Sequence, residues 1–371
     1  MSGIYIHIPF CHSKCGYCDF YSSPRHHNLM GRYVDAIITE AKSRSGETGD
    51  RTETVYIGGG TPSILPDEEL IRLCRNIEYS NLKEMTIEVN PEDIDSNKTN
   101  LFRQLGINRV SMGVQALDDD MLRLMGRRHS ASHAIEAYHT LRAGGIAEIS
   151  LDLIYGLPGQ TVRDWEQSLY GILELHPEHL SAYLLSYEKG TRFHAMQIAG
   201  KLPPQDENMA VEMYDILCEA AHRYGYNHYE ISNFALPGHE AVHNSSYWDM
   251  TPYIGLGAGA HSFNGKNCRR INRSDIASYI ASPLSACDFE DESQEELFND
   301  FVITRLRTAR GLDMEECVNR FGIEAAGRLR QRIQHFITAG KMEFTGTQPH
   351  TVRITENSWL TSDSILVDLI D

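Results

Sequence analysis

The first half of the chain alternates short apolar segments with amphipathic segments of helical period. Strands are expected at Ile4–Ile8, Thr54–Ile57, Met85–Val89, Arg109–Val114, Glu148–Ile154 and His179–Leu185. Helices are expected between them, at Leu29–Lys42, Asp67–Ile77, Thr99–Leu105, Ser132–Ala143 and Val162–Leu173. Strands that alternate with helices form a parallel sheet with the helices outside. The pattern therefore predicts an α/β fold, built either as an open sheet or as part of a β/α barrel.

The second half of the chain has a different pattern. A long helix is expected at Asp206–Tyr224, followed by a stretch rich in Tyr, Asn and Gly from Tyr226 to Phe263. From Asp288 to Asp300, seven of thirteen residues are acidic, which marks a solvated face. Beyond it we expect helices at Glu295–Thr308, Met314–Phe321 and Ala325–Ala339, a hairpin of Met342–Phe344 with Val352–Ile354, and a last helix. The expected division is 1–225, a connector at 226–287, and a C-terminal helical domain at 288–371.

The charge balance argues against some partners. The 371 residues include 34 Lys+Arg and 51 Asp+Glu, a net charge of −17. A negative net charge disfavours binding to the phosphate backbone of a nucleic acid, so nucleic acid is not an expected partner. The sequence contains no stretch of 18 uninterrupted apolar residues, so an integral membrane segment is not expected. The N-terminus lacks the pattern of a secretory signal, and we therefore expect a cytoplasmic protein.

Three of the eight cysteines, Cys11, Cys15 and Cys18, follow the first expected strand in a C-x3-C-x2-C run. Such a cluster in a reducing compartment points to metal. Three thiolates can hold three irons of a [4Fe–4S] cluster and leave the fourth iron open to a ligand. The alternative is a zinc site completed by a nearby histidine, of which there are four: His7, His12, His26 and His27. The remaining cysteines are scattered and are expected to be plain core or surface thiols: Cys74, Cys218, Cys268, Cys287 and Cys317.

The segment YIHIPFCHSKCGYCDF, from Tyr5 to Phe20, resembles the signature of radical S-adenosylmethionine (SAM) proteins, in particular the oxygen-independent coproporphyrinogen III oxidase-like family. The resemblance continues through GGGTP at 58–62, EVNP at 88–91, GVQ at 113–115, DLIYGLPG at 152–159 and residues 255–262. It implies a (β/α)6 partial TIM-type barrel with a smaller, mainly helical, winged-helix-like C-terminal domain. It also implies that the three cysteines bind a [4Fe–4S] cluster whose open iron takes SAM, and that reductive cleavage of SAM gives a 5′-deoxyadenosyl radical.

The resemblance extends to a SAM site. Its segments follow expected strands, at the edge where β/α barrels assemble their sites. The glycines at 58–60 let backbone approach a ligand closely, and Gly59, Gly60 and Thr61 resemble the segment that grips the SAM amino group. The other implied contacts are Glu88, Gln115, Arg127 and Asp152, which without the family would be plain buried or surface polar groups. Tyr5 and Tyr17 flank the cysteine loop and would shield the cluster or simply pack the loop onto the barrel.

Two departures bear on the function. The porphyrin-making oxidases carry a fourth cysteine where this chain has Phe20, and a long arm where only four residues precede Tyr5. The segment from His243 to Trp248 instead has the pattern HNxxYW, which resembles the haem-associated signature of HemW-type haem chaperones. The resemblance implies His243 as a haem ligand, since imidazole binds haem iron; the alternative is a hydrogen-bonded core histidine. His261 is a second candidate, for haem or for the SAM pocket.

The sequence therefore favours a haem chaperone that binds a [4Fe–4S] cluster, SAM and haem, and transfers haem to client haemoproteins, respiratory ones among the candidates. One alternative is an oxygen-independent coproporphyrinogen III oxidase, which decarboxylates propionate side chains in porphyrin biosynthesis. Another is a radical enzyme acting on a different substrate, because a fold alone does not define a function. Whether SAM is cleaved, whether the chain forms a homodimer and whether it touches a membrane transiently all stay open at this stage.

Overall fold

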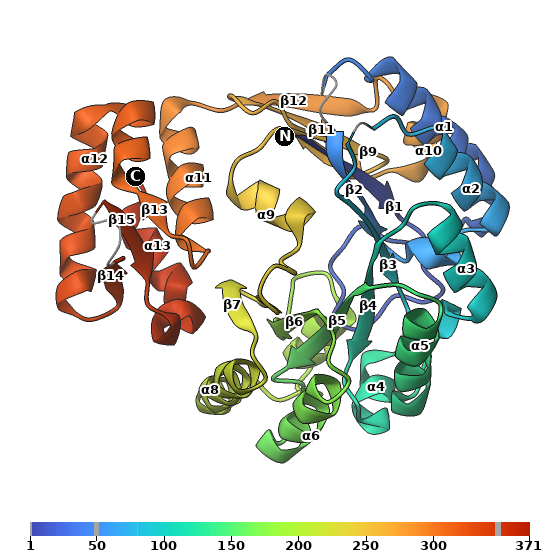
Figure 1. Cartoon of the computed structure of the whole chain (residues 1–371), viewed down its shortest axis with the longest axis horizontal. Helices are drawn as coiled ribbons and strands as arrows, with labels where there is room; N and C mark the ends of the chain where they lie inside the picture. Colours follow the sequence, from blue (N-terminus) through green and yellow to red (C-terminus); the bar gives the residue numbers. More distant parts are fainter. Residues whose placement is uncertain (1, 48–51, 80, 346–349) are drawn as a thin grey trace.

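The computed structural model describes residues 2–47, 52–79, 81–345 and 350–371. The six expected strands are present and run parallel as consecutive neighbours: β1 (Ser2–Ile8), β2 (Thr52–Gly59), β3 (Glu84–Val89), β4 (Arg109–Gln115), β5 (Glu148–Tyr155) and β6 (His179–Leu184). The helices between them cover the outside of the curved sheet (Figure 1): α1 (Met30–Ser43), α2 (Asp67–Arg75), α3 (Ser96–Gln104), α4 (Asp119–Met125), α5 (Ala131–Ala143) and α6 (Val162–Leu173). The expected (β/α)6 partial barrel is confirmed.

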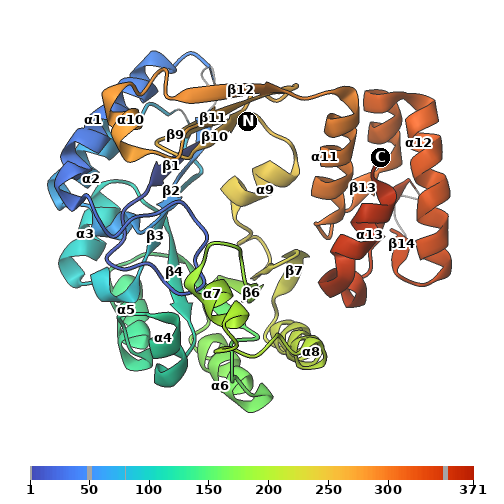
Figure 2. The same ribbon diagram turned by 180° about the vertical axis from the view of Figure 1, so that it is seen from behind.

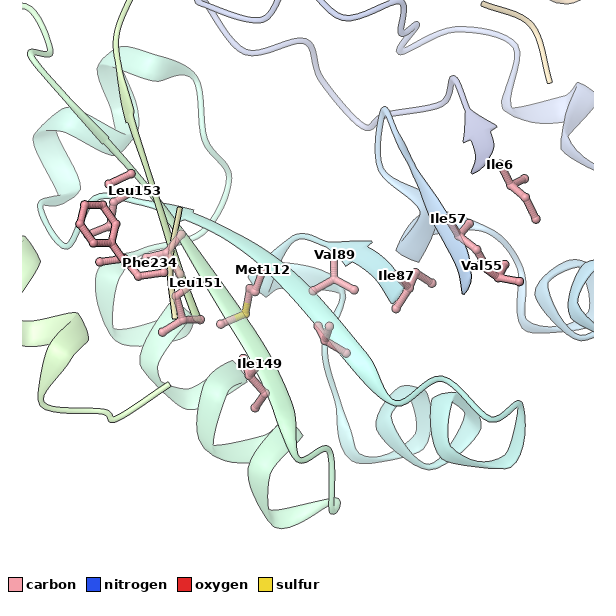
Figure 3. Close-up of a cluster of buried hydrophobic side chains, with 14 of the residues drawn as sticks. Ile6, Val55, Ile57, Ile87, Val89, Met112, Ile149, Leu151, Leu153 and Phe234 are labelled. Atoms are coloured by element: carbon pink, nitrogen blue, oxygen red, sulfur yellow. The ribbon is translucent and has the colours of Figure 1, made fainter. Parts of the chain in front are cut away.

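Side chains alternate across these strands. Those that face the helices are aliphatic and buried, and Figure 3 shows one row of them. The row includes Val55, Ile57, Ile87, Met112, Ile149 and Leu151. The positions between them are mainly polar and face the interior of the partial barrel, as Thr86 and Glu88 do on β3. Because side chains of a strand point alternately to opposite faces, one sequence period builds both an apolar core and a polar cavity.

The segment expected as a connector supplies strands to both edges of the same sheet. Beyond β6 lie the antiparallel strands β8 (Asn233–Ala235) and β7 (Asn227–Glu230). Beyond β1 lie β9 (Tyr253–Leu256), which is parallel to β1, and then β10 (His261–Phe263), β11 (Cys268–Asn272) and β12 (Cys287–Asp291). These strands are short and carry Gly, Asn and Arg, so they lack the apolar alternation by which a strand is recognised in a sequence.

Several helices complete the chain. Three lie in its middle part, α7 (Arg192–Ile198), α8 (Glu207–Arg223) and α9 (Val242–Trp248), and α10 (Ile276–Ala281) follows β11. Single-turn 3-10 helices occur at His27–Leu29, Pro62–Ile64 and Pro91–Asp93. Of these elements only α8 was expected, because helices of one or two turns are too short to show a 3.6-residue period. None of the helices in the described residues is both long and apolar enough to cross a membrane.

The C-terminal part contains the expected helices and hairpin. It comprises α11 (Gln294–Leu306), β13 (Leu312–Asp313), α12 (Met314–Thr338), β14 (Met342–Phe344), β15 (Thr351–Ile354), the 3-10 helix η4 (Glu356–Thr361) and α13 (Ser362–Leu369). The two helices expected around residue 322 are joined as α12, with a kink at Gly322, where φ is 86°. Both views place this part beside the open side of the partial barrel, with α9 and β7 facing it (Figures 1 and 2).

A buried carboxylate joins the barrel to the added strands. Glu40 of α1 is fully buried and accepts hydrogen bonds from Arg44 (3.0 Å), Asn272 of β11 (3.0 Å) and Tyr279 of α10 (2.6 Å). Arg44 is itself 4% exposed and also donates to the carbonyl of Gly255 in β9. Removing one partner of a buried ion pair leaves the other charge uncompensated, which is more costly than the pair is worth.

We therefore expect Glu40→Ala to lower the free energy of unfolding by about 3–5 kcal/mol. The buried Arg44 would keep only the exposed Glu47 as a carboxylate partner, and Asn272 and Tyr279 would lose their buried acceptor. Glu47→Ala is the matched control, since Glu47 pairs with the same guanidinium at 2.8 Å but its side chain is 51% exposed. Its loss should cost less than about 1 kcal/mol. Urea unfolding of the two variants measures the difference. Equal losses of unfolding free energy would contradict the role of Glu40 in joining the barrel to the added strands.

Candidate functional site

A pocket of about 440 Å³ opens at the carboxyl ends of the parallel strands. Most of the residues singled out in the sequence line it: Cys11, Cys15, Tyr17, Cys18, Gly59, Gly60, Thr61, Glu88, Gln115, Arg127 and Asp152. They come from the loop after β1 and from the ends of β2, β3, β4 and β5, together with the loop after α4. The fold thus brings segments far apart in the sequence to one edge of the sheet, as expected for a β/α barrel.

Backbone hydrogen bonds hold the cysteine loop near its ends and in its middle. Near its ends, the amide of Cys11 donates to the carbonyl of Ser23 (3.2 Å). In its middle, Gly16 donates to the carbonyl of Met125 and accepts from the amide of Phe193, both at 2.8 Å. A Cβ at Gly16 would clash with the Phe193 ring, so the loop approaches α7 too closely for any larger residue. These contacts hold the three thiols at the pocket without using the thiols themselves.

The spacing of the three thiols fits a cluster better than a zinc ion. A tetrahedral zinc with Zn–S bonds of about 2.3 Å needs sulfur atoms about 3.8 Å apart. The sulfurs of Cys11, Cys15 and Cys18 do not all lie within 4.8 Å of one another. In a [4Fe–4S] cluster each thiolate binds a different iron, which spreads the sulfurs. Burial also raises the pKa of Cys11 and of Cys18, so a positively charged centre would be needed to hold them as thiolates.

The histidines considered as zinc ligands are engaged elsewhere. Nε2 of His7 donates to the carbonyl of Tyr21 (2.8 Å), and its Nδ1 then accepts from the hydroxyl of Tyr5 (2.9 Å). Nε2 of His27 lies 3.0 Å from the carbonyl of Cys11. His12 and His26 are exposed and are not part of the pocket lining. The alternative Cys3His zinc set is therefore not assembled.

Arg127 connects the cysteine loop to two strand ends. One of its terminal nitrogens lies 3.5 Å from the sulfur of Cys15, and the other donates to Asn90 and to the carbonyl of Gly113, both at 2.6 Å. Burial opposes its charge, but nearby Tyr17 and Cys15 keep its pKa above the ordinary value. The guanidinium is therefore a fixed positive charge beside the thiols.

Gly59 and Glu88 form a second element of the site. Gly59 has a φ of 113°, and a Cβ there would lie 2.5 Å from the His7 ring, so the turn requires glycine. Its amide donates to Oε2 of Glu88 (2.9 Å), while the hydroxyl of Tyr56 donates to Oε1 (2.8 Å). Burial raises the pKa of Glu88 to about 7, against the two hydrogen bonds, which lower it. This carboxyl group therefore titrates near neutral pH.

The end of β4 is irregular at the site. The register with β5 shifts between Gly113 and Gln115, and Gln115 has a φ of 70°, in the left-handed region that residues other than glycine rarely adopt. The bulge turns the Gln115 side chain into the pocket. Close by, Asp152 accepts hydrogen bonds from the hydroxyl of Ser111 at 3.2 Å, and burial raises its pKa to about 6.

Some polar atoms in this pocket have no hydrogen-bond partner among the described residues. They are Nε of Arg127, Nη2 of Arg109 and Oγ1 of Thr86, all buried. Buried polar groups are normally paired, because an unpaired one costs free energy. With the fixed charge of Arg127 and the two carboxyl groups, they fit a polar, partly charged small ligand such as SAM.

The HNxxYW segment lies beneath the pocket, as α9. His243 is fully buried, with Nδ1 2.9 Å from Oγ1 of Thr54 and Nε2 2.8 Å from the hydroxyl of Tyr247. Both ring nitrogens are therefore engaged, and in this structure His243 is a hydrogen-bonded core histidine with neither nitrogen open to iron. The residue of this segment that lines the pocket is its neighbour Asn244. The structure thus shows the hydrogen-bonded core histidine, and the haem-ligand role of His243 stays a prediction from the sequence.

Tyr5 and His261 also lie outside the pocket lining. Tyr5 is half-buried, and through its hydroxyl it fixes the ring of His7, against which Gly59 packs. It supports the site from beneath. His261 begins β10 and is exposed.

The sequence analysis missed the polar lining deeper in the barrel. These residues are Tyr56, Thr86, Asn90, Arg109, Ser111, Ser150, His179, Ser181 and Tyr183. Most sit at every second position of β4, β5 and β6, between aliphatic residues. Strands of a parallel sheet are usually apolar on both faces. Polar residues at every second position of these strands were therefore the signal in the sequence that could have revealed the cavity.

Comparison with known proteins defines the class. Residues 5–169 match the radical SAM superfamily, and residues 293–357 match the HemN C-terminal domain. The solved structure of coproporphyrinogen III oxidase (HemN) from Escherichia coli has the same fold, with a TM-score of 0.83 over 100% of this chain and 90% of that one, at 22% identity. This chain is a radical SAM protein with a HemN-type C-terminal domain.

Two curated relatives define the family within that class. The heme chaperone HemW of Bacillus subtilis (strain 168) is 35% identical over 334 residues, 87% of each chain. The heme chaperone HemW of Lactococcus lactis subsp. lactis (strain IL1403) is 34% identical over 325 residues, 85% of this chain and 84% of that one. The chain belongs to the HemW family.

The raised pKa of Glu88 makes stability depend on pH. The folded protein holds the Glu88 proton up to about pH 7, whereas the unfolded chain releases it near 4.5. Stability from this group is therefore present at acidic pH and is lost as the pH rises through 7. In the unmodified chain, ionisation of Glu88 should lower the free energy of unfolding as the pH rises from 5 to 8. Because glutamine does not ionise, we expect this decrease to be smaller by roughly 1–3 kcal/mol in Glu88→Gln.

The control for this prediction is Glu136→Gln, which changes an exposed carboxylate on α5. Urea unfolding at several pH values measures the slope for each protein. Glu136→Gln should keep the slope of the unmodified chain. A Glu88→Gln variant with that same slope would show that Glu88 is ionised in the folded state.

Proposed function

We propose that this protein is a haem chaperone of the radical SAM fold, which binds a [4Fe–4S] cluster, SAM and haem in the cytoplasm and transfers haem to client haemoproteins. The observation that carries the proposal is the 35% and 34% identity, over most of the chain, to relatives named heme chaperone HemW. The pocket adds physical support, because its thiols and polar groups suit the two cofactors.

The cluster would be held by Cys11, Cys15 and Cys18, and when bound it would supply the electron for reductive cleavage of SAM. The chain's own contribution is the fixed charge of Arg127, 3.5 Å from the Cys15 sulfur. A nearby cation stabilises thiolate and offsets part of the negative charge of a thiolate-bound cluster. Tyr17 lies against the Phe193 ring and limits access of water to this side of the loop.

SAM would be bound by the strand ends next to the cysteine loop. Gly59, Gly60 and Thr61 line the pocket, and the two glycines let this turn pack closely on His7 and on the backbone of Phe10. Glu88 and Asp152 supply carboxyl oxygens for ribose hydroxyls or the amino group. Gln115 is aimed into the pocket by the bulge in β4 and adds an amide that can both donate and accept.

Haem needs an apolar surface near the pocket, and Phe20 provides one. Its side chain lines the pocket and is 66% exposed, while its carbonyl is held by Lys14 (3.0 Å). Tyr183 lines the same pocket and is 44% exposed. A phenyl ring cannot ligate iron as the cysteine of the oxidase pattern could, but it can cover a flat macrocycle. This contrast favours binding of haem over porphyrinogen chemistry.

Anaerobic assay of cluster-reconstituted protein with reductant and SAM tests the proposal. We expect haem to bind at one per chain and coproporphyrinogen III to persist, with little release of 5′-deoxyadenosine. Cys15→Ser should lose the iron–sulfur absorption, whereas Cys74→Ser, which changes a buried thiol of α2, should keep it. Consumption of the porphyrinogen in step with 5′-deoxyadenosine would identify an oxidase. Release that depends on a different added metabolite would identify another radical enzyme.

The burial of His243 predicts the outcome of a haem titration. We expect His243→Ala to lower the melting temperature, because it removes the hydrogen bonds to Thr54 and Tyr247, yet to retain haem binding at one per chain. Phe20→Asp should keep the melting temperature, since the residue is exposed, and weaken haem binding at least about tenfold through loss of apolar contact. Loss of the haem spectrum in a folded His243→Ala protein would instead assign His243 as the ligand.

A further inference from the structure

A second group of metal-ligating side chains lies away from the barrel pocket, where the C-terminal part meets the barrel. It combines Cys218 of α8, His228 of β7 and Glu356 of η4. Nδ1 of His228 is 3.0 Å from Oε1 of Glu356 and 3.9 Å from the sulfur of Cys218, and the three ligand atoms all lie within 4.8 Å of one another. In the part of the chain that the structure describes, no other three His, Cys, Asp or Glu side chains bring their ligand atoms this close together.

His228 presents Nδ1 to this group. Its Nδ1 lies 3.0 Å from Oε1 of Glu356, and its Nε2 lies 3.5 Å from the carbonyl of Ile231. Without a metal, the shorter contact is the hydrogen bond of the neutral tautomer that carries its hydrogen on Nδ1. A metal ion bound between Nδ1 and the carboxylate would take the place of that hydrogen, which would move to Nε2, where the carbonyl of Ile231 can accept it.

The distances suit a metal of small radius. A tetrahedral zinc ion with bonds of about 2.0–2.3 Å places its ligand atoms about 3.3–3.8 Å apart, so the observed 3.0 and 3.9 Å need only small movements. His222 can become a fourth ligand by rotation of its side chain, which is 49% exposed. Its Nε2 is 3.2 Å from Oε1 of Glu356, although it does not lie within 4.8 Å of all three ligand atoms. His222 follows Cys218 by four residues on α8, which puts both side chains on one face of the helix.

Neighbouring side chains fix the ligands. The ring of His228 stacks on Phe234, with centroids 4.0 Å apart, and meets the edge of Trp359 at 4.3 Å. The hydroxyl of Tyr214 donates to the carbonyl of Glu356 (3.2 Å). A cavity of about 600 Å³ reaches His222, His228 and Glu356, so an ion can enter from solvent. Fixed ligands with an entry path are what a metal site requires.

We propose that Cys218, His228 and Glu356, with His222 as the fourth ligand, bind a zinc ion. The set of one thiolate, two imidazoles and one carboxylate favours zinc over magnesium or calcium, which prefer oxygen ligands. Binding replaces the thiol proton of Cys218, which is released to solvent, and it leaves His228 neutral. Because Glu356 belongs to the C-terminal part and the other ligands to the barrel part, the ion fastens the two together.

Cobalt(II) spectroscopy tests the site directly. The parent protein for the test carries Cys11→Ser, Cys15→Ser and Cys18→Ser, so that the loop thiols cannot bind metal. We expect it to take up one cobalt ion with a thiolate-to-cobalt charge-transfer band and the visible bands of a tetrahedral site. Added Zn²⁺ should displace the cobalt and raise the melting temperature. A parent that takes up no cobalt would overturn the proposal.

Single changes in the parent then assign the ligands. Cys218→Ser should lose the charge-transfer band, His228→Ala should lose cobalt binding, and Cys74→Ser, the control thiol, should change neither. His222→Gln alters an exposed residue that folding does not require, and should weaken cobalt affinity about 10- to 100-fold, as loss of a metal-site partner does. A charge-transfer band that persists in Cys218→Ser, or an unchanged affinity in a folded His222→Gln protein, would contradict the assignment.

Discussion

The alternation of side chains across six parallel strands is the constraint on which the rest of the structure depends. Aliphatic residues such as Ile57, Ile87 and Leu151 point outward and bind the helices, so the positions between them must face the interior of the partial barrel. Because those positions hold groups such as Glu88 and Asp152, the interior is a polar cavity instead of a packed core. The elevated pKa values of these two carboxyl groups follow from the same enclosure.

The cysteine loop is held in place by residues of the barrel that lie far from it in the sequence. Gly16 is held by the end of α4 through Met125 and by the start of α7 through Phe193. Arg127, just beyond α4, then joins the Cys15 sulfur to β3 and β4 through Asn90 and Gly113. The geometry of the thiols is therefore set by the order of strands in the sheet, and a loop cut from this context would not retain it.

Sequence reasoning predicted what has a long local pattern and missed what depends on tertiary contacts. The six strands and the flanking helices other than α4 followed from the hydrophobic period, and the residues at strand ends followed from the resemblance to the family. The strands at 227–235 and 253–291 did not, because their pairing with β6 and β1 stabilises segments of weak intrinsic preference. His243 was assigned from its motif, but its burial against Thr54 and Tyr247 depends on a helix packed beneath the barrel. Cys218 was dismissed as an isolated thiol because His228 and Glu356 join it only after folding.

Helix α9, which lies beneath the pocket, is hydrogen-bonded at both of its ends, and this restricts where a large ligand can bind. On the barrel side, Glu84 of β3 accepts hydrogen bonds from the amides of Val242 and His243 at the start of α9, both at 2.9 Å. On the other side, Arg305 of α11 donates to the carbonyl of Trp248 at the end of α9 (3.1 Å). A helix fixed at both ends does not yield to a ligand pressing from above. Under the proposed function, a macrocycle would therefore bind toward the pocket mouth, on the side of the cysteine loop and the exposed Phe20.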